Sequence, residues 1–240
     1  MIENTAYIAL SRQTALRRQI DVIANNIANM NTAAYKNQRM LFEEYLVKPA
    51  AQTRLSFVQD VSVFRELAAG EMRPTNNPLD LAINGDGYFV VETDGGERYT
   101  RNGHFRLDAE GTLVTAEGNP VLDIDSRPIL LDPNERELTI ARDGTVSGAL
   151  GPIAQIAVVD FDDPYQLKAL GGSLYETDQR PRPVNDAALV QGMIEGSNVQ
   201  PIVEMTKLTT LARSYQSTQR LIENDHDLRR RTIRELGRVS

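Results

Sequence analysis

Apolar side chains recur through the first thirty residues at alternating steps of four and three. This spacing places them along one seam of a helix, and only one member of the set is polar. The pattern predicts a helix over residues 2–30, about 40 Å long at ~1.5 Å per residue. The seam consists of Ile2, Ala6, Ala9, Gln13, Leu16, Ile20, Ile23, Ile27 and Met30.

The C-terminal segment repeats this pattern less strictly and ends in a cluster of arginines at 229–231 and 234. Amphipathic helices of this length are marginal in water until their apolar stripe is covered. Two arrangements remain open: the stripes pack on each other or on the middle of the same chain, or other copies of the chain complete them in a polymer. The second seam consists of Leu208, Leu211, Tyr215, Thr218 and Ile222, beside Leu221 and Leu228.

Four asparagines, at positions 25, 26, 29 and 31, interrupt the end of the first predicted helix. Asparagine is poorly suited to a helix interior because its amide competes for backbone hydrogen bonds, whereas it suits helix ends and turns. A simple helix end accounts for Asn29 and Asn31. It does not account for Asn25 and Asn26, so we expect their amides to be paired to other groups.

From residue 84 the pattern changes to short β-rich runs separated by glycine-containing turns seven or eight residues apart, which predicts an antiparallel meander. The run at 155–161 is apolar on consecutive residues and is predicted to be an interior strand. The other predicted strands cover 88–91, 98–100, 104–107, 112–114, 138–141 and 145–147.

The segments that join these regions have weaker patterns. Residues 48–78 are of mixed polarity, with Gly70, Pro74 and Pro78 near the end, and are predicted to form a connecting arm. The predicted fold class is α+β: terminal helices form a coiled-coil-like domain, followed by an extended arm and a central antiparallel β-rich domain. The expected divisions are 1–35 (N-terminal assembly helix), 36–78 (connecting arm), 79–180 (β-rich outer domain), 181–198 (return arm) and 199–240 (C-terminal assembly helix).

Charge is distributed unevenly along the chain, whose 26 basic and 33 acidic residues give a net charge of −7. Residues 1–35 carry +1 and residues 199–240 carry +3, so the middle carries −11. This balance argues against a nucleic-acid partner. The chain has no cysteine, which excludes disulfides, thiolate metal ligands and thiol nucleophiles.

The sequence also argues against insertion into a membrane, because no window approaches the eighteen or so apolar residues that a bilayer-spanning helix needs. Arg12, Arg17 and Arg18 lie where a signal peptide would have its apolar core, and no small-residue cleavage site follows. We therefore expect neither an anchor nor a cleaved signal, so that export would depend on another system.

Candidate chemical residues lack the context that catalysis or ligand binding requires. His104 has no nucleophile or zinc motif near it in the sequence, and His226 lies among charged residues of the last helix. Asp160, Asp162 and Asp163 lack the glycine and glutamate of a calcium loop. We expect no catalytic, metal-binding or cofactor-binding residues and no enzyme activity. One alternative of a different class, a soluble ligand-binding or hydrolytic β protein, rests only on His104 and these carboxylates.

The segment 21–36, DVIANNIANMNTAAYK, resembles the N-terminal signature of the flagellar rod and hook proteins, the axial family of the bacterial flagellum. The resemblance continues in family order at 82–122, at 156–161 (IAVVDF) and at 191–208 (QGMIEGSNVQPIVEMTKL). The opening residues 7–13, Val199-Gln200-Pro201 and the short chain resemble a proximal rod member. The somewhat longer distal rod member of the same family is the alternative.

This resemblance implies a structural subunit that assembles through its terminal helices into the torque-transmitting tube around the export channel. It implies a location in the periplasm-spanning rod of the basal body, and export in unfolded form by the flagellar type III apparatus. The implied partners are other copies of the chain, neighbouring proximal and distal rod proteins and that export apparatus, with no cofactor. The expected assembly interface comprises Leu16, Ile20, Ile23, Asn25, Asn26, Ile27, Asn29, Met30, Asn31, Leu208, Leu211, Tyr215 and Ile222.

Overall fold

The computed structural model describes residues 2–47, 55–132, 138–184 and 187–236. The chain divides into two compact units, which are described separately below. The helical unit contains the chain up to Ala28, Gln38–Glu66 and the residues from Gln200 onward. The β unit contains Asn29–Asn37 and Leu67–Val199.

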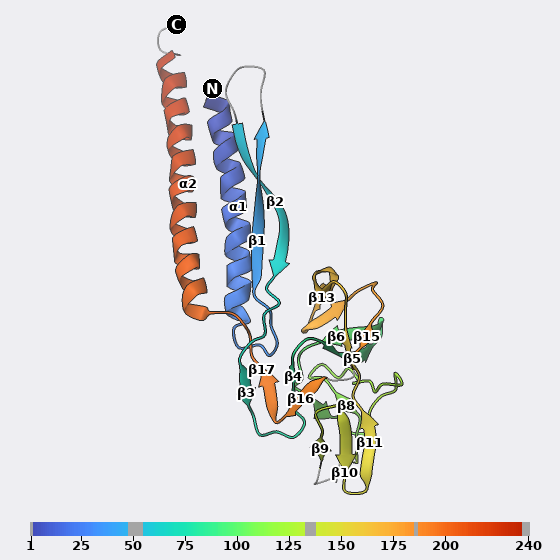
Figure 1. Ribbon diagram of the computed structural model, residues 1–240. Helices are drawn as coiled ribbons and strands as arrows, with labels where there is room; N and C mark the ends of the chain where they lie inside the picture. The colour runs from blue at the N-terminus through green and yellow to red at the C-terminus, as the bar shows by residue number, and fades with distance from the viewer. Residues whose placement is uncertain (1, 48–54, 133–137, 185–186, 237–240) are drawn as a thin grey trace. The chain divides into compact units, whose positions relative to one another are not determined.

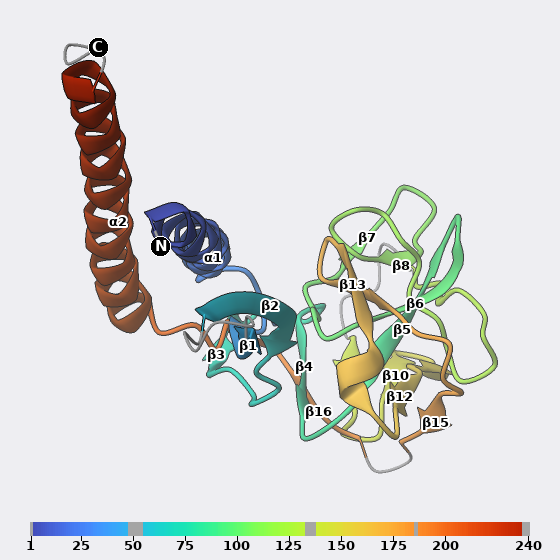
Figure 2. The same ribbon diagram turned by 90° about the horizontal axis from the view of Figure 1, so that it is seen from above.

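The helical unit consists of two helices and a long β-hairpin (Figure 1; Figure 2). Helix α1 spans Ile2–Ala28, helix α2 spans Pro201–Leu236, and strands β1 (Gln38–Val47) and β2 (Leu55–Arg65) pair antiparallel. Helix α1 contacts both α2 and the hairpin. Neither described helix has a stretch of residues apolar enough to cross a membrane. The two predicted helices are therefore present, and α1 ends two residues before the predicted end at Met30.

The hairpin differs from the extended arm that the sequence predicted over 36–78. Its register shifts opposite Leu41 and Phe42, which pair with Ser62 and Asp60, so Val61 is an extra residue and the alternation of residues along β2 is broken. A break of this kind hides the two-residue period by which strands are recognised in a sequence. Part of the predicted arm, residues 48–54, lies outside the described residues.

The residues at the helix ends follow general capping rules. After Ala28 the chain turns at once, and the Thr32 N–H donates to the Asn29 carbonyl at 3.1 Å. Pro201 is the first residue of α2, where its missing N–H costs no helical hydrogen bond. Glu204 lies in the first turn of α2, where the helix dipole favours a negative charge.

The β unit contains several small antiparallel sheets and one of six strands, ordered β13-β14-β6-β5-β12-β15. A three-stranded sheet has the order β11-β10-β9, and three further pairs are β16–β4, β17–β3 and β7–β8. One short 3-10 helix, η1, spans Pro164–Gln166. The strands are β3 Met72–Pro74, β4 Leu81–Asn84, β5 Tyr88–Thr93, β6 Gly96–Thr100, β7 Arg106–Leu107, β8 Leu113–Val114, β9 Thr139–Ile140, β10 Thr145–Gly148, β11 Gly151–Gln155, β12 Val158–Asp160, β13 Lys168–Gly171, β14 Leu174–Glu176, β15 Arg182–Pro183, β16 Ala188–Gln191 and β17 Met193–Glu195.

The architecture confirms the α+β class, while the strand order is more complex than the predicted meander. Strands β5 and β6 form a hairpin, but each also pairs with a strand far along the chain, β12 and β14 respectively. The predicted strand 155–161 is divided between the end of β11 and β12. Strand β12 lies between β5 and β15, as expected for an interior strand.

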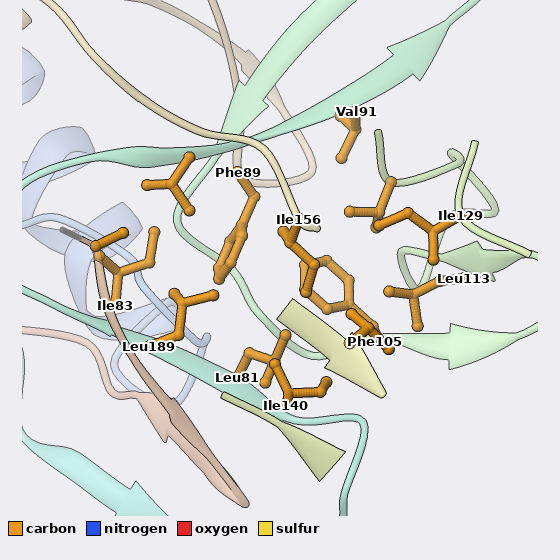
Figure 3. Packing of buried hydrophobic residues seen from close by; sticks show 14 of the residues in the cluster. Leu81, Ile83, Phe89, Val91, Phe105, Leu113, Ile129, Ile140, Ile156 and Leu189 are labelled. Carbon is orange, nitrogen blue, oxygen red and sulfur yellow. The ribbon is translucent and has the colours of Figure 1, made fainter. Parts of the chain in front are cut away.

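Both faces of the six-stranded sheet are covered by buried side chains. Phe89 and Val91 of β5 point into the larger cluster shown in Figure 3, where the rings of Phe89 and Phe105 meet edge to face at 5.1 Å. The intervening residues Tyr88 and Val90 belong to a second cluster on the other face. Strand β5 is therefore buried on both sides, and this double burial stabilises the β unit.

Candidate assembly site and its two polar clusters

Asn26 forms the centre of a polar cluster in the helical unit. Its side chain is fully buried, and its Nδ2 donates to the Gln38 carbonyl at 2.8 Å. Its Oδ1 accepts from the Gln38 N–H at 2.9 Å. The expectation that the Asn26 amide is paired is therefore confirmed, and its partner is the backbone at the start of β1.

Glu204 joins helix α2 to the same cluster. Its side chain is buried, and its Oε2 lies 3.4 Å from Asn26 Nδ2. Its Oε1 accepts from Lys207 Nζ at 2.6 Å, and Lys207 is partly exposed. We call Asn26, Gln38, Glu204 and Lys207 the Asn26 cluster. It links the end of α1, the first residue of β1 and the first turns of α2.

The other predicted site residues of the helical unit are buried to different degrees. Ile23 is buried, whereas the side chain of Asn25 is exposed. Helices α1 and α2 contact each other within the chain. The half-buried members of the predicted site in this unit are Leu16, Ile20, Ile27, Leu208, Leu211, Tyr215 and Ile222.

Other apolar side chains of the helical unit remain exposed. The most exposed of those in α2 is Ile202, with 82% of its surface accessible. Among the residues of this unit whose exposure the structure describes, the large exposed apolar ones are Leu10, Leu41, Val63, Ile202, Val203, Met205, Leu221 and Leu228.

A second polar cluster lies inside the β unit and centres on Glu195, whose exposed fraction is 2%. Its Oε1 accepts from Lys36 Nζ at 2.7 Å and from the Gly70 N–H at 2.9 Å. Its Oε2 accepts from Arg101 Nε at 2.9 Å. Both basic side chains are also buried, so one carboxylate is shared by two cations away from solvent.

These contacts alter the ionisation of the cluster. Burial acts to raise the pKa of Glu195, but Arg101 and Lys36, together with the Gly70 N–H, outweigh it and lower that pKa. Burial lowers the pKa of Lys36, opposed by its attraction to Glu195. Glu195 is therefore held as the anion in the folded β unit.

The remaining predicted site residues, Asn29, Met30 and Asn31, form the turn after α1. Asn29 accepts from the side chain of Thr32, whereas Asn31 is exposed. The sequence prediction assigned no role to Gln38, Lys36, Arg101, Glu195 or Glu204. Lys36 and Glu195 lie within the segments that resemble the axial family, but nothing in the spacing of the sequence pairs them.

The candidate chemical residues have structural partners. Nδ1 of His104 lies 2.7 Å from Asp80 Oδ1. Arg182 pairs with Asp160 and Asp162, and Asp163 accepts from the Tyr165 N–H at the start of η1. Within the described ranges, no group of three or more histidine, aspartate or glutamate side chains has metal-binding geometry. These contacts give no support to a ligand-binding or hydrolytic role.

Three family models match the chain, each over a different part. Residues 7–36 match the flagella basal body rod protein model. Residues 82–148 match the D1 domain of the flagellar hook protein FlgE/F/G, and residues 190–235 match the C-terminal region of flagellar basal body rod FlgEFG proteins. The matches thus cover both helical ends and part of the β unit.

Relatives that match the chain over its whole length or nearly so are also flagellar basal-body rod proteins. The chain is 41% identical to the flagellar basal-body rod protein FlgF of Caulobacter vibrioides and 34% identical to that of Mesorhizobium japonicum, covering all of each chain. It is 30% identical to the flagellar basal-body rod protein FlgG of Bacillus subtilis, over 92% of this chain and 95% of the relative. Both FlgF proteins are matched at higher identity than this FlgG protein.

The three matched regions and the whole-length relatives define a component of the flagellar basal body. The chain belongs to the flagellar basal-body rod protein family. It is a structural rod subunit of the basal body, and the resemblance inferred from the sequence is confirmed.

Proposed function

We propose that the chain is a subunit of the proximal rod, as the higher identity to FlgF proteins favours. In this proposal, subunits assemble into the tubular shaft that transmits torque and surrounds the export channel. Neighbouring copies and other rod proteins, including FlgG, are the partners. The distal rod is the alternative within the same family.

The observation that carries the proposal is the exposed apolar surface of the helical unit. Ile202, Met205 and Leu221 of α2 keep about half or more of their surface in contact with solvent. Burying apolar surface against another subunit is favourable by roughly 25 cal/mol per Å² before the cost of association is subtracted. A neighbouring helix that covers these side chains would thus stabilise a polymer.

In this proposal the seam residues predicted from the sequence form the contact between neighbouring subunits. The seam residues that are half buried within one chain, among them Leu16, Ile20, Leu211 and Tyr215, retain surface for a neighbour's helix. Helices α1 and α2 would then extend their contact into coiled-coil-like columns shared between subunits. The turn residues Asn29, Met30 and Asn31 and the exposed Asn25 form the edge of the proposed interface.

The proposal includes the route to the rod. The chain would pass through the flagellar type III export apparatus in unfolded form and fold on docking. The absence of cysteine is compatible with such passage, because the chain cannot form disulfides on entering an oxidising compartment. Its proposed location is the part of the rod that spans the periplasm.

Charged substitutions in α2 test the proposal. Ile202→Asp combined with Leu221→Asp should leave the monomer folded, because both side chains are already exposed, but should prevent incorporation into rods. The matched control is Leu150→Asp, since Leu150 is a fully exposed leucine of the β unit. Rods isolated from cells expressing each variant should contain the control but not the double variant. Normal incorporation and motility with the double variant would contradict the proposal.

A further inference from the structure

The chain passes between the helical unit and the β unit four times. The passages follow Ala28, Asn37, Glu66 and Val199. On the β-unit side, a short segment adjoins every passage. Residues 29–37 join the first passage to the second, the residues just after 66 follow the third, and residues 193–199 precede the fourth. Each of these segments contains Glu195 or forms hydrogen bonds with Glu195 or Asn198.

Glu195 forms hydrogen bonds with the segments that adjoin the first three passages and itself belongs to the segment that precedes the fourth. Its backbone carbonyl accepts from the Ala34 N–H at 2.8 Å. Its carboxylate accepts from Lys36 Nζ and from the Gly70 N–H on the same oxygen, Oε1. One residue thus contacts segment 29–37 at two points and the chain that follows the hairpin at a third.

Asn198 ties the same segments together a second time. Its Oδ1 accepts from the Asn37 N–H at 2.6 Å, and its own N–H donates to the Tyr35 carbonyl at 3.2 Å. Its Nδ2 donates to the Ala68 carbonyl at 2.9 Å, which also accepts from Lys36 Nζ at 2.9 Å. The passages are therefore joined to one another as well as to Glu195.

Arg101 fixes this arrangement to the β sheet. Its Nε donates to Glu195 Oε2, and its two terminal nitrogens donate to the carbonyls of Gly87 at 2.9 Å and Gly85 at 2.8 Å. The loop 85–87 leads directly into β5, the strand buried on both faces. The planar guanidinium makes these bonds in fixed directions, which a lysine at this position would not reproduce.

We propose that Glu195 is a positioning residue that locks the four passages into one arrangement on the β unit, so that a load on this unit reaches the helices through all passages together. This inference rests on the proposed role as a torque-transmitting rod subunit. Buried ion pairs are seldom more stabilising than well-packed apolar groups, so stability alone is a weak reason for three buried charges here. Charge-assisted hydrogen bonds instead impose defined lengths and directions.

Amide hydrogen exchange of the full-length chain tests this positioning role of Glu195. In Glu195→Gln, the amides of Ala34, Gly70 and Asn198 should exchange faster by about tenfold or more, because their local opening becomes easier. The amides of Leu113 and Val121, which donate to Ile129 and Leu113 in the core, report the loss of global stability, and their acceleration should be at least about tenfold smaller than that of the three passage amides. Acceleration by the same factor throughout the β unit would indicate a merely stabilising role and would overturn the proposal, as would unchanged exchange in the passages.

Two further variants keep this test decisive. Asp162→Asn is the matched control, since Asp162 pairs with Arg182 in the same unit but is 80% exposed, and its exchange pattern should equal that of the unmodified chain. Lys36→Met retains the pair between Arg101 and Glu195 and serves if Glu195→Gln fails to fold. It should accelerate exchange of the Ala34 and Gly70 amides more than that of Leu113, and equal or unchanged exchange would refute the positioning role of Glu195.

Measurements in cells separate this inference from the proposed function. With Glu195→Gln or Lys36→Met, rods should assemble, but swimming speed in viscous medium should fall relative to Asp162→Asn. Equal swimming under load would overturn the mechanical role of Glu195 while leaving the rod assignment intact. Normal rods and motility in cells lacking the chain altogether would refute the proposed function, whatever the exchange pattern shows.

Discussion

The side-chain amide of Asn26 and the backbone of Gln38 form two hydrogen bonds, one in each direction, at 2.8 and 2.9 Å. The amide takes the place that a neighbouring strand's peptide group would occupy at the first residue of β1. A buried helix residue thereby satisfies backbone groups twelve positions later in the chain. This pairing fixes where the hairpin begins relative to α1.

Replacing Asn26 should destabilise the helical unit. In Asn26→Ala the partly buried N–H and carbonyl of Gln38 lose their partner, and we expect a loss of about 2 kcal/mol in the free energy of unfolding. Asn26→Asp should cost more, because a carboxylate cannot donate to the Gln38 carbonyl and lies beside the buried Glu204. Urea unfolding followed by helical circular dichroism measures both. Asn25→Ala, at an exposed neighbouring position, should cost less than either.

Glu195 should give the β unit a characteristic pH dependence. Because the surrounding cations lower the pKa of Glu195, its contribution to stability is complete above the unfolded carboxyl pKa of about 4.3 and is lost as pH falls through the lower folded-state pKa. The unmodified chain should therefore lose stability on acidification in this window. Glu195→Gln should show a flatter acid profile, measured by urea unfolding with tyrosine fluorescence across acidic pH. Parallel profiles would contradict this expectation.

At neutral pH the substitutions in the Glu195 cluster should follow a definite order. Glu195→Gln leaves two buried cations without a counter-ion, for which we expect a loss of about 3–5 kcal/mol. Lys36→Met should cost less, because Arg101 still pairs with the carboxylate at 2.9 Å. Equilibrium unfolding of both variants under one condition tests the ranking, and the reverse order would show that Lys36 carries most of the stabilisation.

Gly70 occupies a position where any side chain would collide with backbone. A Cβ there would lie 1.9 Å from the Gly196 carbonyl oxygen, so Gly70→Ala must displace one of the two segments. We expect a destabilisation of about 3 kcal/mol, at the upper end for overpacking. Gly95→Ala is the control, since its Cβ would meet only the end of the Arg98 side chain. Thermal unfolding should separate the two variants clearly, and similar midpoints would argue against a close approach at Gly70.

The core shown in Figure 3 supplies a final prediction. Phe89→Ala removes a fully buried ring in contact with Phe105 and should cost about 3–5 kcal/mol. Phe105→Leu keeps much of the apolar volume and should cost less than Phe89→Ala. Urea midpoints of the tyrosine signal measure both. A small effect of Phe89→Ala would mean that the cavity is filled by movement of its neighbours.

The sequence predicted the elements whose burial follows a regular period. The seam from Leu16 to Ile27 identified α1, and the glycine-bounded run at 88–91 identified β5, because a helix covered on one side and a strand covered on both sides leave clear patterns. The hairpin β1–β2 was missed. The extra residue Val61 in β2 breaks the alternation on which recognition of that strand depends.

The polar clusters were only partly accessible from the sequence. Asn26 was identified as needing a partner because an asparagine in a helix interior is unfavourable, but Gln38 was not identified because its contribution comes from backbone atoms. Lys36 and Glu195 lie 159 residues apart, and a single charged residue carries no signal of burial. Pairs of this kind are set by tertiary packing and emerge only when the fold brings the segments together.

The pairing of β3 with β17 has a consequence for how the family can diversify. Met72 lies opposite Glu195 in this ribbon, so the intervening chain departs and returns at the same place. In topological terms the segment between the two strands is an insertion. Apart from Arg101 and the 85–87 loop, its loops can be lengthened or fitted with a tag without changing the spacing of the strands at its base, which makes it a suitable place for engineering to add new surface.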